Sequence, residues 1–106
     1  MVPTDALADP IVRTVVTAIN AGDRAAFLAA FTTHPTLSDD GSERNFHDWI
    51  DREIFSSGGH LEVESQSADG RSLIARYRND IYGEMRTSWA FVIDGGKISR
   101  VQTGQA

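Results

Sequence analysis

Hydrophobic and polar positions along the chain change their period once, from helical spacing before Gly59 to alternation after it. The first hydrophobic stripe has helical spacing and comprises Ile11, Val12, Val15, Val16 and Ile19. Asp9 is a good helix N-cap, Pro10 suits the first helical position, and Gly22 suits the left-handed residue after a helix. The pattern therefore predicts a helix that begins at Pro10 and ends before Gly22.

Two further helices are expected before Gly59. The second begins after a cap at Asp23 and ends at His34-Pro35, because the residue before a proline is pushed out of the α region. Its buried stripe is Phe27, Leu28 and Phe31. The third helix begins after Asn45, and its apolar face is Phe46, Trp49, Ile50 and Ile54. Between these helices, residues Thr36 to Gly41 predict a short extended piece that ends in a turn.

After Gly59 the alternation of apolar and polar side chains predicts strands. The core-side positions of the first three strands are Leu61, Val63 and Ser65, then Leu73, Ala75 and Tyr77, then Met85, Thr87, Trp89, Phe91 and Ile93. A fourth strand covers roughly Lys97 to Thr103, and glycine-containing turn signals separate the strands. Helices followed by an antiparallel meander predict an α+β fold in a single domain over residues 1–106, with a sheet of four main strands.

Loop lengths decide which strand positions face one another. A three-residue loop, Ala68-Asp69-Gly70, keeps apolar residues on one face, whereas a two-residue loop would mix the faces. The facing pairs expected from it are Leu61–Tyr77, Val63–Ala75, Leu73–Trp89, Ala75–Thr87 and Tyr77–Met85. In the last hairpin, the register that keeps Ile98 in the core also places Arg100 and Gln102 there, with Arg100 near Trp89.

Composition narrows the classes of function. The 106 residues carry a formal charge of −5, which argues against a nucleic-acid binder, because such a protein needs a basic stripe. The absence of cysteine excludes disulfides, thiolate nucleophiles and iron–sulfur clusters. His34, His47 and His60 lack the spacing of a zinc site, so we expect no metal and no cofactor. Met1 to Asp5 has no signal-peptide pattern and no long apolar run follows, which indicates a cytoplasmic protein without membrane contact.

Three segments carry a resemblance to a known family. They are AINAGD after the first helix, FLAAFTTHPTLSDDG with its acidic turn, and FVIDGGKISRVQ near the end of the chain. In this order they resemble the SnoaL-like branch of the nuclear transport factor 2-like superfamily, over about Pro10 to Thr103. The resemblance implies three helices wrapped against a strongly curved sheet, a cone with a pocket at its open end, and frequent homodimers. It implies no single activity, because this fold hosts enzymes, carriers and transport factors.

Ketosteroid isomerases, which belong to this superfamily, combine a carboxylate base with an oxyanion hole made by a tyrosine and a protonated acid. Asp39 and Asp40 occupy a plausible base region here. Because the two aspartates are adjacent, at most one can face a pocket. Asp40 is preferred, since it precedes the rim turn at Gly41. The alternative is that both aspartates simply form that turn. The first helix carries no tyrosine and the third strand no core-side acid. The isomerase pattern is therefore incomplete.

Aromatic and cationic side chains supply the candidate binding residues. Arg100 would either anchor an anionic or carbonyl group beside an indole or reach solvent at the mouth of the cone. The remaining candidates either line a pocket for a flat apolar ligand or form an ordinary core. They are Trp49, Trp89, Tyr77, Met85, Phe31 and Thr87.

Two functions follow from these residues. The preferred one is a non-catalytic module that binds a small apolar or aromatic molecule, because the oxyanion pattern is missing. The alternative is a general acid/base enzyme of isomerase, cyclase or hydratase type, acting on a small apolar carbonyl compound. Asp40 or Asp39 would then be the base, and Tyr77 or Arg100 would polarise the carbonyl.

A homodimer is expected through the outer face of the sheet. The register places a patch of small, mildly apolar residues there, flanked by charges, and such a patch favours sheet-on-sheet contact over lasting exposure. Its members are Ile74, Ser88, Ala90, Ser99 and Val101.

Overall fold

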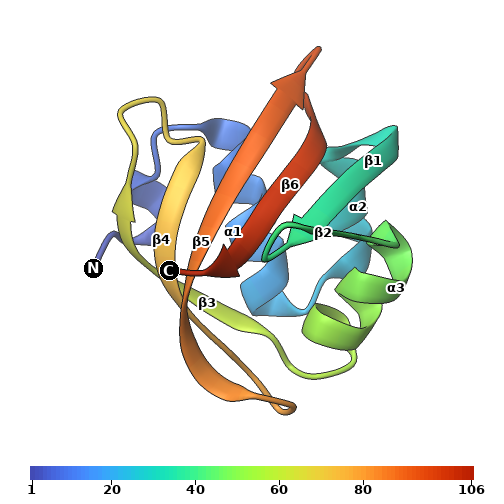
Figure 1. The fold of residues 1–106 in the computed structure, drawn as a ribbon. Helices are drawn as coiled ribbons and strands as arrows, with labels where there is room; N and C mark the ends of the chain where they lie inside the picture. Colours follow the sequence, from blue (N-terminus) through green and yellow to red (C-terminus); the bar gives the residue numbers. More distant parts are fainter.

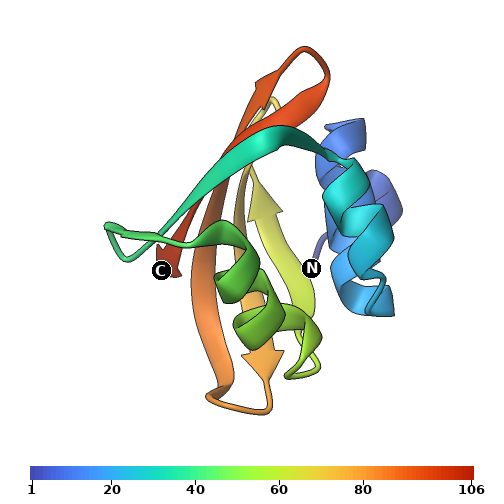
Figure 2. The ribbon, with the colours of Figure 1, turned by 90° about the vertical axis from the view of Figure 1, so that its right-hand side faces the viewer.

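The computed structural model describes residues 1–106 as three α-helices packed on one face of a curved, six-stranded sheet (Figures 1 and 2). The helices are α1 (Pro10–Ala21), α2 (Arg24–Ala29) and α3 (Phe46–Ile50), with a short turn η1 (Thr4–Ala6) before α1 and a π-helical turn η2 (Asp51–Phe55) after α3. The strands are β1 (Phe31–Asp39), β2 (Ser42–Arg44), β3 (His60–Gln66), β4 (Ser72–Asn79), β5 (Gly83–Asp94) and β6 (Lys97–Gln105). The α+β class is confirmed, and one hydrophobic core lies between the helices and the sheet.

Helix α1 has the ends that the sequence predicts. The Asp9 carboxylate accepts hydrogen bonds from the backbone N–H groups of Ile11 at 2.8 Å and Val12 at 3.1 Å. Gly22 ends the helix in the left-handed conformation, with φ of 66°. These caps satisfy backbone groups that a helix end otherwise leaves unpaired.

The expected end of the second helix at His34-Pro35 is wrong. Helix α2 already stops at Ala29, and Phe31 begins β1, which runs through the proline to Asp39. The pairing of β1 with β6 shifts register between Phe31 and Thr36, so the proline lies where no regular ladder needs its missing N–H. Because β1 and β6 are parallel and β2 pairs with β1, the sheet is mixed and has six strands instead of four antiparallel ones.

The central strands have the expected register. Leu61 faces Tyr77, Val63 faces Ala75, and Leu73 faces Trp89. A bulge between Val63 and Ser65 lengthens the first hairpin, so that the Ser67 N–H donates to the carbonyl of Ser72 at 2.9 Å. The loop between these two serines is therefore one residue longer than expected, although Gly70 does take a left-handed conformation, with φ of 73°.

The expected register of the last hairpin is wrong. A register shift between Val92 and Ile93 leaves Ile98 in the core but reverses the facing of the residues after it. Thr103 then faces Trp89 from the core side, and Val101 is buried beside Phe91. The same shift carries Arg100 and Gln102 to the outer face, and it removes Val101 from the expected dimer patch.

Candidate functional site

A pocket of about 200 Å³ that is partly open to solvent lies between the sheet and the α3–η2 segment, and we call it the interior cavity. Trp49 of α3, Tyr77 of β4 and Trp89 of β5 line it, together with Tyr82 from the turn between β4 and β5. The two indoles meet edge to face, with their ring centroids 6.2 Å apart. Met85 and Thr87 complete the β5 side of the cavity. The structure thus brings together at one cavity five of the candidates that the sequence suggests: Trp49, Tyr77, Met85, Thr87 and Trp89.

Glu53 is the most unusual residue of this cavity. Its side chain is only 7% exposed. One carboxylate oxygen, Oε1, accepts a hydrogen bond from the Tyr82 hydroxyl at 3.3 Å. The other oxygen, Oε2, is buried and has no hydrogen-bond partner. A buried acceptor without a partner costs free energy, and because Glu53 lines the cavity, a ligand that displaces the atoms covering this oxygen can supply the missing partner.

The position of Glu53 follows from the local backbone. The residue lies in η2, four positions after Trp49, and therefore on the same apolar face of the α3–η2 segment. Its backbone carbonyl accepts from the Tyr77 hydroxyl at 2.6 Å and from the Asn79 amide at 2.9 Å. These contacts hold the turn against β4. At Gly59 an added Cβ would collide with the Tyr77 hydroxyl, so the glycine permits the close approach.

The sequence analysis missed Glu53. A signal for it was present, because the apolar face of the third expected helix, with Trp49, Ile50 and Ile54, includes position 53 at helical spacing. A charged residue within such a stripe is rarely buried unless it is paired or functional.

Hydroxyl and indole groups around the cavity already donate to protein acceptors. The Trp49 Nε1 donates to Asp39 at 3.1 Å, and the Trp89 Nε1 donates to Thr87 Oγ1 at 2.8 Å. The Thr87 hydroxyl donates to the Ala75 carbonyl at 3.3 Å. Thr103 and the two tyrosines are engaged in the same way. These donors are therefore occupied, whereas the free hydrogen-bonding capacity at Glu53 is that of an acceptor.

Tyr77 is held as a neutral phenol. Burial raises its pKa well above the ordinary value, and the negative charge of Glu53 raises it further, while a hydrogen bond involving Asn79 opposes the shift. Its hydroxyl proton is directed at the Glu53 backbone carbonyl instead of into the cavity. Tyr77 therefore does not present the free donor that a carbonyl-polarising role requires.

The two aspartates differ in their placement. Asp39 is half-buried, and its carboxylate accepts from the Trp49 indole. Asp40 lines the cavity from the exposed turn after β1, in a left-handed conformation with φ of 50°. Its Oδ1 accepts from the backbone N–H of Gln105 at 2.9 Å. Asp40 is the aspartate at the cavity, but that carboxylate oxygen is engaged by the end of β6.

Besides Asp39, two expected site residues do not line the cavity. Arg100 lies on the outer face, where it donates to Thr36 and forms an ion pair with Glu43. This pairing raises the pKa of Arg100 and lowers the pKa of Glu43, in each case first through their hydrogen bond. Phe31 packs in the core against Phe27 and Phe46, with ring centroids 4.7 and 4.9 Å away.

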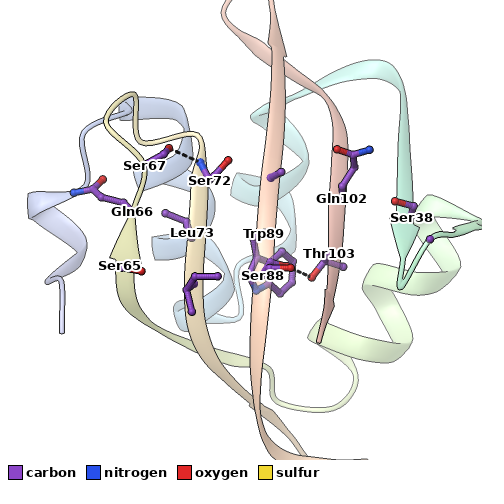
Figure 3. Close-up of a pocket in the computed structure, with 13 residues that line it drawn as sticks. Ser38, Ser65, Gln66, Ser67, Ser72, Leu73, Ser88, Trp89, Gln102 and Thr103 are labelled. Atoms are coloured by element: carbon purple, nitrogen blue, oxygen red, sulfur yellow. Dashed lines mark hydrogen bonds between the residues drawn. The ribbon is translucent and has the colours of Figure 1, made fainter. Parts of the chain in front are cut away.

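A second hollow, of about 550 Å³, lies on the outer face of the sheet (Figure 3). Ser65, Ser88 and Gln102 line it, together with Ala90 and Ile74. We call it the outer groove. It is larger than the interior cavity, but no charged residue lines it and none of its side-chain polar atoms is buried without a partner. The interior cavity is therefore the better candidate for a specific ligand site.

Other kinds of site have no counterpart in the structure. No group of three or more His, Asp or Glu side chains is arranged to hold a metal ion. No helix combines the length and the apolarity needed to cross a membrane.

Comparisons with known proteins identify the fold. No protein-family model and no curated protein matches the chain. A solved NTF2-like protein of unknown function from Cytophaga hutchinsonii is similar, with a TM-score of 0.76 and 13% identity, over 100% of this chain and 92% of that one. A candidate polyketide cyclase from Sinorhizobium meliloti gives a TM-score of 0.75 and 19% identity, over 95% and 98% of the two chains.

A third similar structure contains a ligand. It is a Mycobacterium tuberculosis protein in complex with estradiol-17β-hemisuccinate, with a TM-score of 0.74 and 16% identity, over 91% of each chain. Together these structures show that the chain has the nuclear transport factor 2-like fold, as the sequence resemblance implied.

Proposed function

We propose that this protein binds a small, partly aromatic molecule in its interior cavity. The observation that carries the proposal is Glu53, whose buried Oε2 has no partner inside an aromatic cavity. A protein selected for stability alone gains nothing from such a group, because its desolvation is left uncompensated. A ligand that contacts the free oxygen supplies the missing interaction.

Size restricts the ligand. Pockets that hold drug-sized molecules usually span roughly 300–1,000 Å³. A cavity of about 200 Å³ therefore accommodates a smaller molecule, on the scale of one ring with a short substituent. The similar structures include a protein bound to a steroid derivative and a designed 17-OHP binder, which supports ligand binding inside this fold. Those ligands are larger than the one we propose here.

General-base catalysis is the second candidate function. Glu53 favours it, because a buried carboxylate oxygen beside a cavity can take a proton from a bound substrate. Glu53 then replaces Asp40 and Asp39 as the candidate base. The engaged donors of Tyr77, Thr87 and Trp89 weigh against this function, because a developing oxyanion needs a free donor. Binding without catalysis is therefore our first proposal.

The two tryptophans of the chain provide the test, because both line the cavity. Titration with benzyl alcohol should change the tryptophan fluorescence and shift backbone amide NMR signals around Glu53, Tyr77 and Trp89. Thr87→Phe narrows the cavity and should weaken this binding at least about tenfold, a loss of about 1.4 kcal/mol.

Ser88→Phe is the matched control, because Ser88 is the next residue along β5 and lines the outer groove instead. It should leave the affinity for benzyl alcohol unchanged. Amide shifts confined to the outer groove, or an affinity lost only in Ser88→Phe, would contradict the proposal. If Thr87→Phe does not fold, the shifts in the parent protein decide alone.

A further inference from the structure

We infer that the ligand of the interior cavity is a small aromatic or cyclic amine, bound as an ammonium cation by the Glu53 carboxylate. This inference rests on the proposed function and adds the chemical class of the ligand. It comes from three properties of the cavity, which are its charge, its aromatic surface and its unused hydrogen-bonding groups.

The charged residues that line the cavity are both acidic. They are Glu53 on the inner wall and Asp40 at the exposed turn, and no lysine, arginine or histidine lines it. Arg52 is the cation nearest to the Glu53 carboxylate, with its guanidinium nitrogen 3.8 Å from Oε1. The Arg52 side chain is half-exposed and approaches the oxygen that Tyr82 also contacts, so Oε2 has neither a cation nor a hydrogen-bond donor beside it. A cationic ligand is attracted to this cavity, and a carboxylate ligand is repelled.

The aromatic surface suits the same ligand. Tyr77 and Trp89 have ring centroids 5.7 Å apart, and the centroids of Trp49 and Trp89 are 6.2 Å apart. An ammonium group is attracted to an aromatic face when it lies within about 6 Å of the ring centroid, most strongly where water is excluded. Glu53 lines the same cavity as these rings, so a cation bound by its carboxylate shares the cavity with them. The apolar part of the ligand packs against the same rings.

The hydrogen-bonding groups point in the same direction. The hydroxyl and indole donors around the cavity are occupied by protein acceptors, as shown for Tyr77, Thr87 and Trp89. A ketone or a carboxylate ligand finds no free hydroxyl or indole donor among these three residues, and the side-chain amides of Asn79 and Gln105 are the remaining donors of the lining. An ammonium group brings three donors and can give one of them to Glu53 Oε2. Because donor and acceptor are both charged, this hydrogen bond is stronger than one from a neutral hydroxyl.

The test compares three probes of similar size and shape. Benzylamine, benzyl alcohol and benzoate are titrated separately into the whole protein at pH 7, and their dissociation constants are measured by calorimetry. Benzylamine should bind at least about tenfold more tightly than benzyl alcohol, and benzoate should bind more weakly than both. In Glu53→Gln the preference of benzylamine over benzyl alcohol should fall to less than about twofold. Glu62→Gln, which changes an exposed glutamate of β3 outside the cavity, should keep it.

The outcomes separate this inference from the proposed function. If benzyl alcohol binds as tightly as benzylamine, or benzoate binds best, the amine inference is overturned while ligand binding stands. A preference for benzylamine that persists in Glu53→Gln also overturns it, because the charge of Glu53 is then not its source. If no probe binds the parent protein, the proposed function fails as well. The comparison of probes in the parent protein is decisive even if a variant does not fold.

Discussion

The hydroxyl of Tyr82 donates a hydrogen bond to Oε1 of Glu53, so that an exposed tyrosine contacts a buried carboxylate. As a whole residue, Tyr82 is 58% exposed and belongs to the turn between β4 and β5, whereas the whole Glu53 residue is 5% exposed. The contact therefore joins the surface of the protein to the inner wall of the cavity. Because Tyr82 is exposed and lines the cavity, we assign it to the mouth of the cavity.

Removing the Tyr82 side chain should speed the exchange of ligand. Tyr82→Ala opens the mouth and deletes the hydrogen bond to Glu53, so the dissociation rate of benzylamine should rise several-fold. Stopped-flow fluorescence of the two tryptophans measures this rate. Ile81→Ala is the matched control, because Ile81 lies in the same turn and is 50% exposed but does not line the cavity. Equal rates in the two variants would exclude Tyr82 as part of the mouth.

Replacing Glu53 should stabilise the ligand-free protein. Glu53→Met keeps a similar volume and removes a buried carboxylate whose Oε2 has no partner. The free energy of unfolding should rise by about 1–3 kcal/mol, because the desolvation cost of that group disappears. Urea denaturation measures the change. A loss of stability of similar size would mean that Glu53 supports the fold through its side chain and is not held there for a ligand.

Tyr77 should make stability fall at alkaline pH. In the unfolded chain a tyrosine releases its proton near pH 10, whereas burial and the charge of Glu53 raise the pKa of Tyr77 in the fold. Above about pH 10 the unfolded state therefore binds fewer protons than the folded state, and the free energy of unfolding decreases as pH rises. Below that pH the contribution is fully present. Tyr77→Phe should flatten this decrease between pH 9 and 11 in urea denaturation; an unchanged slope would contradict the assignment.

The outer face of the sheet remains our proposed homodimer interface. With the observed register its patch contains Ile74, Ser88 and Ala90, with Val92 beside them 48% exposed. Ala90→Arg places a charge at the centre of this patch and should release monomers, as measured by light scattering at micromolar concentration. Ser56→Arg, at an exposed position after η2, is the control. A monomeric parent protein would rule out the interface.

The sequence predicts the parts of the fold that depend on local signals. Asp9, Pro10 and Gly22 define α1 because capping acts within one turn of a helix. The central register follows from alternation, because a slip of one residue at Tyr77 would bury Arg76. The wrong end of the second helix comes from competition between distant segments. Phe31 suits a helical stripe as well as a strand, and its pairing with Ile98 of β6 decides between them.

The candidate site was predicted only in part, because local alternation identifies some of its residues and not others. The aromatic residues of the cavity follow from the strand alternation, which places Tyr77 and Trp89 on the core face. Arg100 was placed there wrongly, because a bulge at Ser99 of β6 reverses the facing of the residues that follow it, and no glycine or proline marks that position. Glu53 shares the apolar face of Trp49 and Ile54 at helical spacing, but its position at the cavity also depends on contacts of the π-helical turn with Tyr77 and Asn79, which are distant in the sequence.

A crystal structure of the protein with bound benzylamine would show directly whether Glu53 binds an amine in the interior cavity. We expect the ligand in this cavity, with its nitrogen within hydrogen-bonding distance of Glu53 Oε2 and its ring against Trp49 and Trp89. A ligand in the outer groove, or one in the cavity with its nitrogen directed away from Glu53, would rule out this binding mode.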